Sequence, residues 1–277
     1  MRQVLQHHDP SIDLSLVAPV YEEEDNLEPL FEMVSKGLET SKLRWELVLV
    51  DDGSSDDSWN RIVRLGDTDP RVRGVRFREN RGQSAAMATG IAAAHGTLIA
   101  TLDADLQNDP ADLPRMVSEL QRREVDVIVG YRAKRKDDAI RRLSSKLANR
   151  VRNGLTGDTI RDTGCSLKVF TRAAAASIPW FDGMHRFLPT VLRYQGFEVD
   201  EVPVDHHPRQ FGLSKYGVWN RAFRAGRDLF AIRWMKARML TVSVAETNDP
   251  RTKTIAPQAS ANRPEGTSRP VDRETAR

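Results

Sequence analysis

The sequence has very little cysteine and no long apolar segment. Cys165 is the only cysteine among 277 residues, which excludes an intrachain disulfide and a cysteine-based zinc site. No run of about 18 apolar residues occurs, so a membrane-spanning helix is not expected. Residues 1–13 are polar and lack the charged-then-apolar pattern of a secretory leader. These absences are compatible with a soluble protein of a reducing cytosol.

Two glycine-rich phosphate-binding motifs are also missing. Neither G-x-G-x-x-G, typical of dinucleotide-binding folds, nor the P-loop motif G-x-x-x-x-G-K-[ST] occurs. The dinucleotide and P-loop interpretations therefore lose their main support. A hydrophobic fraction of 39% over this length still suits one α/β domain with a sizeable core, or two small ones.

Charge is distributed unevenly along the chain. The formal net charge is +3, yet residues 11–131 contain 13 Lys and Arg against 23 Asp and Glu, a net of −10. The remaining residues therefore carry a net charge of +13. An acidic first half suits a bound cation, and a basic second half suits anionic ligands or an anionic surface.

Short apolar segments alternate with helical patterns between residues 14 and 131. Strands are expected at 14–19, 45–50, 72–77, 97–102 and 125–129. Helical patterns end near Leu38 and Leu65, cover 82–94, and resume at Pro110 or Pro114. This alternation predicts an α/β fold with a largely parallel sheet flanked by helices.

Acidic residues follow three of the expected strands. They are Glu22 to Glu24, Asp51, Asp52, Asp103 and Asp105. Ligands of open α/β sheets bind beyond the carboxyl ends of the strands, so three acidic turns at one edge indicate a site. Asp103, Asp105 and Gln107 alternate, and an extended backbone would point them to the same side. Such oxygen ligands suit Mg²⁺ or Mn²⁺ bound to a nucleotide diphosphate, whereas solvated, helix-capping turns are the alternative.

Two later segments combine basic and apolar residues at helical spacing. Residues 132–152 hold nine Lys and Arg against two Asp, and residues 218–240 set aromatic residues among arginines. Both patterns predict basic amphipathic helices that either dock on the core or face a membrane or partner. Residues 245–277 are rich in Pro, Ser, Thr and charge, which predicts a disordered tail.

Nine short motifs occur in order along the chain. They are VAPVYEE (17–23), VDDGSSD (50–56), NRGQSAAMATG (80–90), DADLQNDP (103–110), VGYR (129–132), RDTGC (161–165), HRFLP (185–189), EVPVDHHPR (201–209) and GLSKYG (212–217). Together they resemble family-2 glycosyltransferases, and in particular the branch of dolichyl- and polyprenyl-phosphate glycosyltransferases typified by dolichol-phosphate mannosyltransferase. VDDGS is common to the wider family, whereas the ordered set with DADLQ, HRFLP and SKYG is specific to this branch. The resemblance implies a single nucleotide-diphospho-sugar transferase domain of the GT-A-like kind.

The resemblance also implies roles for individual residues. Nucleotide-sugar binding is implied for Pro19, Tyr21, Glu23, Val50, Asp52, Asp103, Ala104 and Asp105. Metal binding is implied for Asp103, Asp105 and Gln107, and binding of donor or acceptor phosphates for Arg132, Arg209 and Lys215. Asp103, Asp105 and Arg132 are the catalytic candidates, with Asp162 a weaker candidate for orienting sugar or acceptor. Glu22 departs from the asparagine that is usual in the family and adds a charge near the nucleotide.

The implied reaction is inverting transfer of a sugar from a GDP- or UDP-sugar to a dolichyl- or undecaprenyl-type polyprenyl phosphate. Mg²⁺ or Mn²⁺ would neutralise charge on the leaving diphosphate. The expected organisation is an N-terminal extension at 1–13, a glycosyltransferase domain at 14–217, a basic amphipathic helix at 218–244 and the tail. The anchor that many relatives carry after SKYG is missing. The enzyme is therefore expected to lie peripherally on the inner, cytoplasmic face of the membrane, held by its basic helices or by an integral membrane partner.

Two other functions remain open. One is a family-2 glycosyltransferase acting on another acceptor in cell-envelope glycan or lipid A biosynthesis. The other is a non-enzymatic protein that binds anionic membranes or nucleic acid, although the acidic strand ends argue against nucleic acid. His206 and His207 would point to opposite sides of an extended segment, which disfavours a zinc site.

Overall fold

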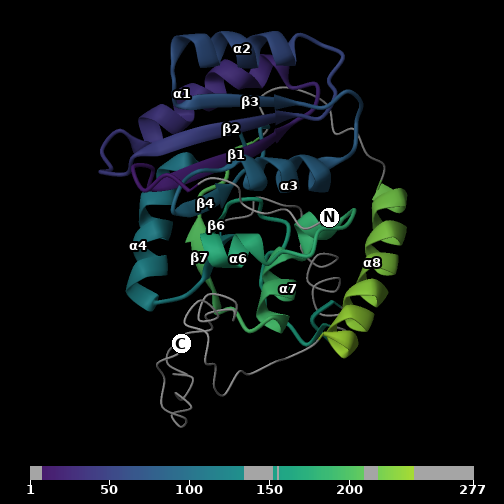
Figure 1. Ribbon diagram of the computed structural model, residues 1–277. Helices are drawn as coiled ribbons and strands as arrows, with labels where there is room; N and C mark the ends of the chain where they lie inside the picture. The colour runs from purple at the N-terminus through teal and green to yellow at the C-terminus, as the bar shows by residue number, and fades with distance from the viewer. Residues whose placement is uncertain (1–7, 134–151, 155, 209–217, 240–277) are drawn as a thin grey trace, which may run out of the picture. The chain divides into compact units, whose positions relative to one another are not determined.

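The computed structural model describes residues 8–133, 152–154, 156–208 and 218–239, with side chains of the last helix described from Gly226 (Figure 1). All of these residues belong to one compact unit, Met1–Val242. The helix expected within 132–152 falls mainly outside the described residues. So do Arg209, Lys215 and the expected tail at 245–277.

Seven strands of the described chain form one sheet in the order β3-β2-β1-β4-β6-β5-β7. They are β1 Leu14–Val20, β2 Trp45–Asp51, β3 Val72–Arg76, β4 Leu98–Thr101, β5 Val127–Arg132, β6 Lys168–Thr171 and β7 Val199–Val204. Every pairing is parallel except those of β6, which runs antiparallel to β4 and β5. The largely parallel α/β sheet is thus confirmed, but β6 is a strand that the sequence did not indicate.

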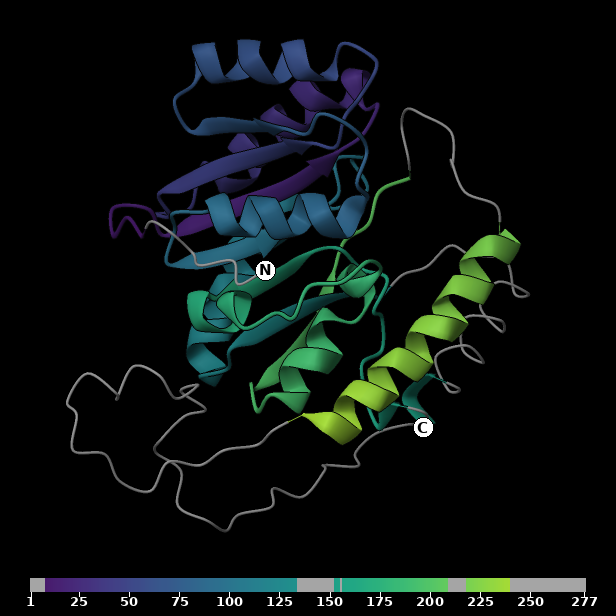
Figure 2. The same ribbon diagram turned by 45° about the vertical axis from the view of Figure 1, so that its right-hand side comes forward.

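Helices cover both faces of the sheet, as Figures 1 and 2 show. They are α1 Leu27–Leu38, α2 Ser58–Thr68, α3 Gln83–Ala93, α4 Leu113–Arg123, α6 Arg172–Ala176, α7 Leu188–Tyr194 and α8 Val218–Arg238. Short 3₁₀ turns lie at η1 Glu24–Asn26, η2 Pro110–Asp112 and η3 Met184–Arg186. Strand side chains alternate between the faces, so Leu14 and Leu16 join one apolar cluster while Val17 joins the other.

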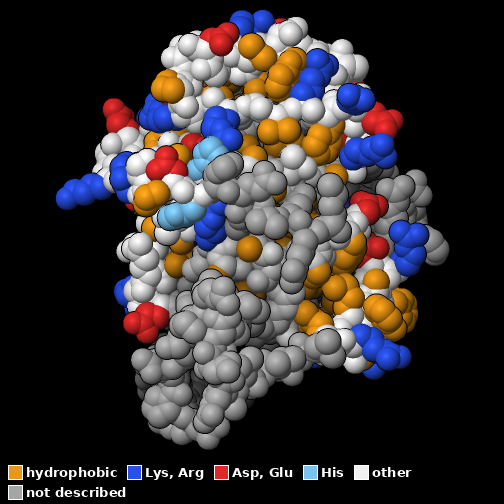
Figure 3. All heavy atoms as spheres, in the orientation of Figure 1, with side chains coloured by type: hydrophobic (Ala, Val, Ile, Leu, Met, Phe, Trp, Pro, Cys, Tyr) orange, Lys and Arg blue, Asp and Glu red, His pale blue; other side chains and the backbone are white. Residues whose placement is uncertain are grey.

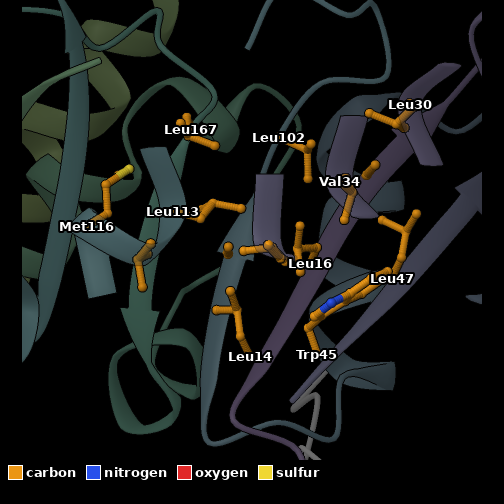
Figure 4. Close-up of a cluster of buried hydrophobic side chains, with 14 of the residues drawn as sticks. Leu14, Leu16, Leu30, Val34, Trp45, Leu47, Leu102, Leu113, Met116 and Leu167 are labelled. Carbon is orange, nitrogen blue, oxygen red and sulfur yellow. The ribbon is translucent and has the colours of Figure 1, made fainter. Parts of the chain in front are cut away.

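The first cluster lies between the sheet and α1, α2 and α4. Figure 4 shows its central part, where Leu16 of β1 and Leu47 of β2 lie among side chains of α1 and α4. In α1 the residues Leu27, Leu30, Val34 and Leu38 recur at helical spacing and are buried. Burial of this stripe, rather than the intrinsic helix propensity, therefore holds α1 in place.

The second cluster lies between the sheet and α3, α6, α7 and α8. α3 consists mostly of small residues, which lets it approach β1 and β2 closely. A β-carbon on Gly90 would lie only 2.3 Å from Cγ1 of Val17, so this position of the helix requires glycine. The close approach brings the N-terminus of α3 to the edge of the sheet where the strands end.

Candidate functional site

The three acidic turns lie at one edge of the sheet. β2, β1 and β4 are parallel neighbours. Val20 and Asp51, the last residues of β1 and β2, are paired, and Thr101, the last residue of β4, pairs with Val17 of β1. Because β6 is antiparallel, its amino-terminal residue Lys168 lies at the same edge, opposite Thr101. The expectation that these turns share an edge is confirmed.

The turns after β1 and β2 are joined by hydrogen bonds. The backbone N–H of Glu22 donates to Ser54 Oγ at 2.9 Å, and that of Glu23 donates to Ser58 Oγ at 3.1 Å. Ser55 Oγ donates to the Glu22 carboxylate at 3.1 Å. Glu22 has a φ of 52°, a left-handed conformation that costs about 1–3 kcal/mol for residues other than glycine. The hydrogen bonds that Glu22 donates to Ser54 and accepts from Ser55 stabilise that conformation, so Glu22 itself takes part in the junction.

Asp52 orients the loop that precedes α3. Its Oδ1 accepts from the backbone N–H of Arg81 at 2.7 Å, and its Oδ2 accepts from Gly82 at 2.8 Å. The side chain is almost fully buried, and burial raises the pKa of Asp52 although the two amide bonds lower it. Its neighbour Asp51 pairs with Arg76, the Nε lying 3.1 Å from Oδ2.

The Asp103–Gln107 segment is a turn and not an extended strand. β4 ends at Thr101, and Leu106 has a φ of 60°. The prediction that an extended backbone aligns Asp103, Asp105 and Gln107 is therefore wrong, because the chain reverses after Ala104. Hydrogen bonds orient these side chains instead, and Asp105 Oδ1 accepts from the backbone N–H of Gln107 at 3.2 Å.

Asp103 is held through both its backbone and its carboxylate. Its N–H donates to Asn108 Oδ1 at 3.2 Å, and its Oδ1 accepts from Gln83 Nε2 at 2.8 Å. Asn108 Oδ1 also accepts from Ser166 Oγ at 2.6 Å, which joins the turn to the segment before β6. Three separate parts of the chain thus determine where the Asp103 carboxylate lies.

The turn is also joined to the segment that follows β7. The backbone N–H of His207 donates to the Gln107 carbonyl at 2.9 Å, and Asn108 forms a β-bridge with His206. His207 Nε2 lies 3.1 Å from Asp109 Oδ2. The residues immediately before Arg209 are therefore attached to the Asp103–Gln107 turn.

Arg132, the last residue of β5, forms a bidentate ion pair with Asp162. Nε and Nη2 of Arg132 donate to the two carboxylate oxygens at 2.7 Å and 2.9 Å. The two side chains are only 15% and 13% exposed, so solvent screens the pair weakly. Asp162, the weaker candidate in the sequence, is the residue that orients the guanidinium of Arg132.

Lys168 is a buried cation at this edge. Its side chain is 2% exposed, and its Nζ donates to the carbonyl oxygen of Cys165. Burial lowers the pKa of Lys168, while the charges of Cys165, Asp103 and Asp162 act in the opposite direction.

Comparison with known proteins identifies the fold and the family. Residues 15–178, more than half of the chain, match the model of the family Glycosyl transferase family 2. The chain belongs to glycosyl transferase family 2. Relatives of this family-2 member include a dodecaprenyl-phosphate galacturonate synthase from Rhizobium johnstonii, 43% identical over 231 residues, covering 81% of this chain and 68% of that protein. An undecaprenyl-phosphate 4-deoxy-4-formamido-L-arabinose transferase from Salmonella choleraesuis is 34% identical over 208 residues. The match covers 75% of this chain and 63% of that protein.

The chain spans about two thirds of the length of these relatives, 68% and 63%. Solved structures share its fold. One is glucosyl-3-phosphoglycerate synthase from Mycobacterium tuberculosis, crystallised with Mn²⁺, uridine diphosphate and glucosyl-3-phosphoglycerate. It aligns with a TM-score of 0.58 and 18% identity, and the alignment covers 84% of this chain and 82% of that chain. A mannosyltransferase from Pyrobaculum calidifontis, in complex with GDP-mannose and Mn²⁺, aligns with a TM-score of 0.58 and 20% identity. The alignment covers 94% of this chain and 74% of that chain. The GT-A-like fold and the resemblance to bacterial polyprenyl-phosphate glycosyltransferases are confirmed.

Two of the residues expected to bind the nucleotide sugar lie in the core of this family-2 domain. Val50 is fully buried, and its side chain faces Gly90 of α3. Ala104 packs in the cluster beneath α1 and α4. Both side chains are therefore buried in the core rather than exposed at the edge of the sheet. Pro19, Tyr21 and Glu23 lie at the edge and are half-buried, and Glu23 accepts a hydrogen bond from Asn26.

The donor atoms at this edge suit a hard divalent cation. No group of three or more His, Cys, Asp and Glu residues arranged to hold a metal occurs among the described residues. Asp103 and Asp105 supply two carboxylates in one short turn, and Mg²⁺ or Mn²⁺ takes its remaining oxygen ligands from water and phosphates. The residues present therefore fit a metal that is held jointly by protein and diphosphate.

Sequence reasoning missed Gln83, Asn108 and Lys168. Gln83 lies in the NRGQSAAMATG motif and Asn108 in DADLQNDP, so both motifs carried a signal without indicating what the side chains contact. Lys168 gave no signal, since a lysine in a short apolar run reads as a surface residue.

Proposed function

We propose that the protein transfers a sugar from a nucleotide sugar to a polyprenyl phosphate, with inversion and with Mg²⁺ or Mn²⁺. GDP- and UDP-sugars are the donor classes, and dolichyl- or undecaprenyl-type phosphate is the acceptor. The single observation that carries the proposal is the hydrogen-bonded junction of three acidic turns at the sheet edge around Asp103 and Asp105. The names of the two relatives, each a polyprenyl-phosphate transferase, support the acceptor class.

Asp103 and Asp105, with Gln107, would hold the metal. When bound, it neutralises charge on the diphosphate as that group leaves. The protein's own contribution is orientation, since the Gln83 and Gln107 hydrogen bonds set the two carboxylates before any ligand arrives.

Arg132 would position a phosphate of donor or acceptor. Its ion pair with Asp162 fixes the plane of the guanidinium, and a fixed plane is what bidentate phosphate binding requires. Arg209 and Lys215 would supply further positive charge. The acceptor phosphate is already anionic near neutral pH, so the nucleophile needs no strong general base.

The helix α8 would hold the protein on an anionic lipid surface. Phe230 and Trp234 are 69% and 65% exposed and four residues apart, so they lie on one side of the helix. Arg227 and Arg233 are exposed beside them. Figure 3 shows hydrophobic and basic side chains next to each other over the lower part of α8. Apolar side chains bordered by cations complement the acyl chains and headgroups of an anionic bilayer.

The opposite side of α8 attaches it to the domain. Ile232 is fully buried, Lys236 Nζ donates to the Thr156 carbonyl at 3.1 Å, and the same ammonium lies 4.9 Å from the centre of the Tyr194 ring. No helix among the described residues is long and apolar enough to span a bilayer. Because nucleotide sugars are cytoplasmic metabolites, we assign the protein to the inner face of the membrane, with an integral membrane partner as the alternative attachment.

The proposed reaction is tested with purified full-length protein, GDP- and UDP-sugars, Mn²⁺ or Mg²⁺, and a short polyprenyl phosphate. Release of nucleoside diphosphate together with glycosylated lipid is the expected result. Asp105→Asn should lower kcat/KM by at least about 100-fold, because removal of a metal ligand costs more than the 10–100-fold typical of residues that only support ligands. Asp67→Asn makes the same change at an exposed position of α2 and should leave turnover unchanged.

Two results would contradict the proposal. Turnover by Asp105→Asn at the wild-type rate would contradict the metal assignment. Sugar transfer that is indifferent to the added polyprenyl phosphate would instead favour another envelope acceptor.

A further inference from the structure

The start of α3 contacts three different parts of the site. Arg81 and Gly82, just before the helix, donate their backbone N–H groups to Asp52. Gln83, the first residue of the helix, donates its side-chain amide to Asp103. Ser84 accepts hydrogen bonds from the backbone N–H groups of Gly183 and His185, at 3.1 Å and 3.4 Å. Four consecutive residues thus connect the turns after β2 and β4 with the HRFLP segment.

The contact between Gln83 and Asp103 is suited to orienting a metal ligand. The distance from Gln83 Nε2 to Asp103 Oδ1 is 2.8 Å, a good length for an N–H···O bond. A neutral amide leaves the negative charge of the carboxylate intact, and a carboxylate oxygen can accept more than one bond. A lysine or arginine in this place would offset the charge that attracts the cation.

Gln83 has a fixed position from which to act. The adjacent Ser84 is buried, and its hydroxyl also lies 2.8 Å from Nδ1 of His185. Gly90, about two turns after Gln83, allows α3 to pack directly against Val17 of β1. Because both ends of this stretch are packed, the amide reaches Asp103 from a rigid element rather than from a loop.

Asp103 is fixed at its other end as well. Its backbone N–H donates to Asn108, which is buried and bonded to Ser166. The hydrogen bond from Gln83 also restricts rotation of the carboxylate about its own side-chain bonds. Hydrogen bonds of this kind to metal ligands commonly contribute 10–100-fold in metal affinity.

We propose that Gln83 is a positioning residue of the metal site, which sets the carboxylate of Asp103 for binding Mg²⁺ or Mn²⁺. This inference rests on the proposed function in one respect, namely that Asp103 is a metal ligand. Gln83 does not touch the metal or the substrates. It acts through Asp103.

The experiment compares Mn²⁺ binding by Gln83→Met and by the wild type, measured by electron paramagnetic resonance. Binding is measured with Mn²⁺ alone and with Mn²⁺ plus UDP or GDP. Methionine keeps the length of the side chain and removes the N–H donor. The Kd for Mn²⁺ should rise about tenfold. Gln121→Met makes the same change on the exposed side of α4 and should leave the Kd unchanged. Gln83→Ala repeats the loss of the donor without a bulky side chain, in case the methionine packs badly.

Kinetics distinguish positioning from a structural role. In Gln83→Met the KM for Mn²⁺ should rise about tenfold, while saturating Mn²⁺ restores most of the wild-type kcat. A lowered thermal midpoint with an unchanged Mn²⁺ affinity would overturn the inference. Absence of Mn²⁺ binding by the wild type, with either nucleotide, would overturn the proposed function itself, so the two failures are distinguishable.

Discussion

Single residues at the sheet edge act mainly by orienting one another. Asp52 holds the loop before α3, Gln83 holds Asp103, and Asp162 holds Arg132. In each case a charged or amide side chain takes its direction from a partner that is distant in the sequence. Substitution of the partner should therefore weaken the site, although less than substitution of the residue that meets the ligand.

The ion pair of Arg132 and Asp162 gives the clearest test at this scale. Asp162→Ala leaves a guanidinium that is 15% exposed without its carboxylate, and should lower the free energy of unfolding by about 3 kcal/mol. Urea unfolding measures this loss. The double variant Arg132→Met with Asp162→Leu should regain most of the stability but not the sugar transfer, because the cation is lost. Full activity of the double variant would show that Arg132 does not meet a phosphate.

Among the elements, α8 has two sides that differ in burial. One side carries Ile232 and Lys236 against the domain, and the other presents Phe230 and Trp234. Exposing two large apolar side chains one turn apart to water is unfavourable in free energy. Burial of both side chains in a bilayer interface removes that cost.

Membrane attachment through α8 is tested with the full-length protein and vesicles of phosphatidylcholine with or without phosphatidylglycerol. The wild type should co-sediment with the anionic vesicles, and less so at high salt because screening weakens the contribution of Arg227 and Arg233. Phe230→Ser with Trp234→Ser should weaken binding by at least about tenfold, since two large apolar side chains no longer enter the interface. Val63→Ser removes an exposed apolar residue of α2 and serves as the control. Failure of the wild type to bind either vesicle would favour a protein partner.

For the molecule as a whole, a second buried polar cluster lies at the edge of the sheet opposite the candidate site. At the amino-terminal edge of β1 and β2, Glu46 is buried and accepts from Ser15 Oγ at 2.6 Å, from the His95 backbone N–H at 2.6 Å and from Arg73 at 2.8 Å. These partners come from β1, β3 and the turn before β4. One carboxylate therefore ties together four segments of the fold away from the candidate site.

The stability of the domain should depend on pH through Glu46. Burial raises the pKa of this carboxyl, but the hydrogen bonds from Ser15, His95 and Arg73 outweigh burial and hold the pKa below its ordinary value of 4.5. A depressed folded-state pKa means that this stabilisation is complete above about pH 4.5 and is lost as the pH falls further. Glu46→Gln should therefore lower the free energy of unfolding at pH 7, with a difference from wild type that shrinks below pH 4.5.

Urea unfolding at several pH values checks this expectation. Mn²⁺ binding by folded Glu46→Gln should remain at the wild-type level, because Glu46 lies at the other edge of the sheet. A difference from wild type that grows on acidification would contradict the assignment.

Much of the fold was predictable from residues that are close in the sequence. The segment around Leu16 and that around Leu47 are buried apolar runs, and the amphipathic stripe of α1 has regular spacing. The acidic turns were predictable as a site because parallel strands end at one edge. β6 was not, since it has four residues, begins with a lysine, and exists only through pairing with β4 and β5.

By itself, the amino-acid sequence determined the alternation of strands and helices, the acidic turns and, through its motifs, the family. Those are properties of local pattern and residue type. Only the tertiary structure decided that the Asp103–Gln107 segment forms a turn, that Gln83 reaches Asp103, and that Asp162 forms an ion pair with Arg132. These contacts join residues up to 30 positions apart, and such pairings depend on how helices and strands pack, which local sequence does not encode.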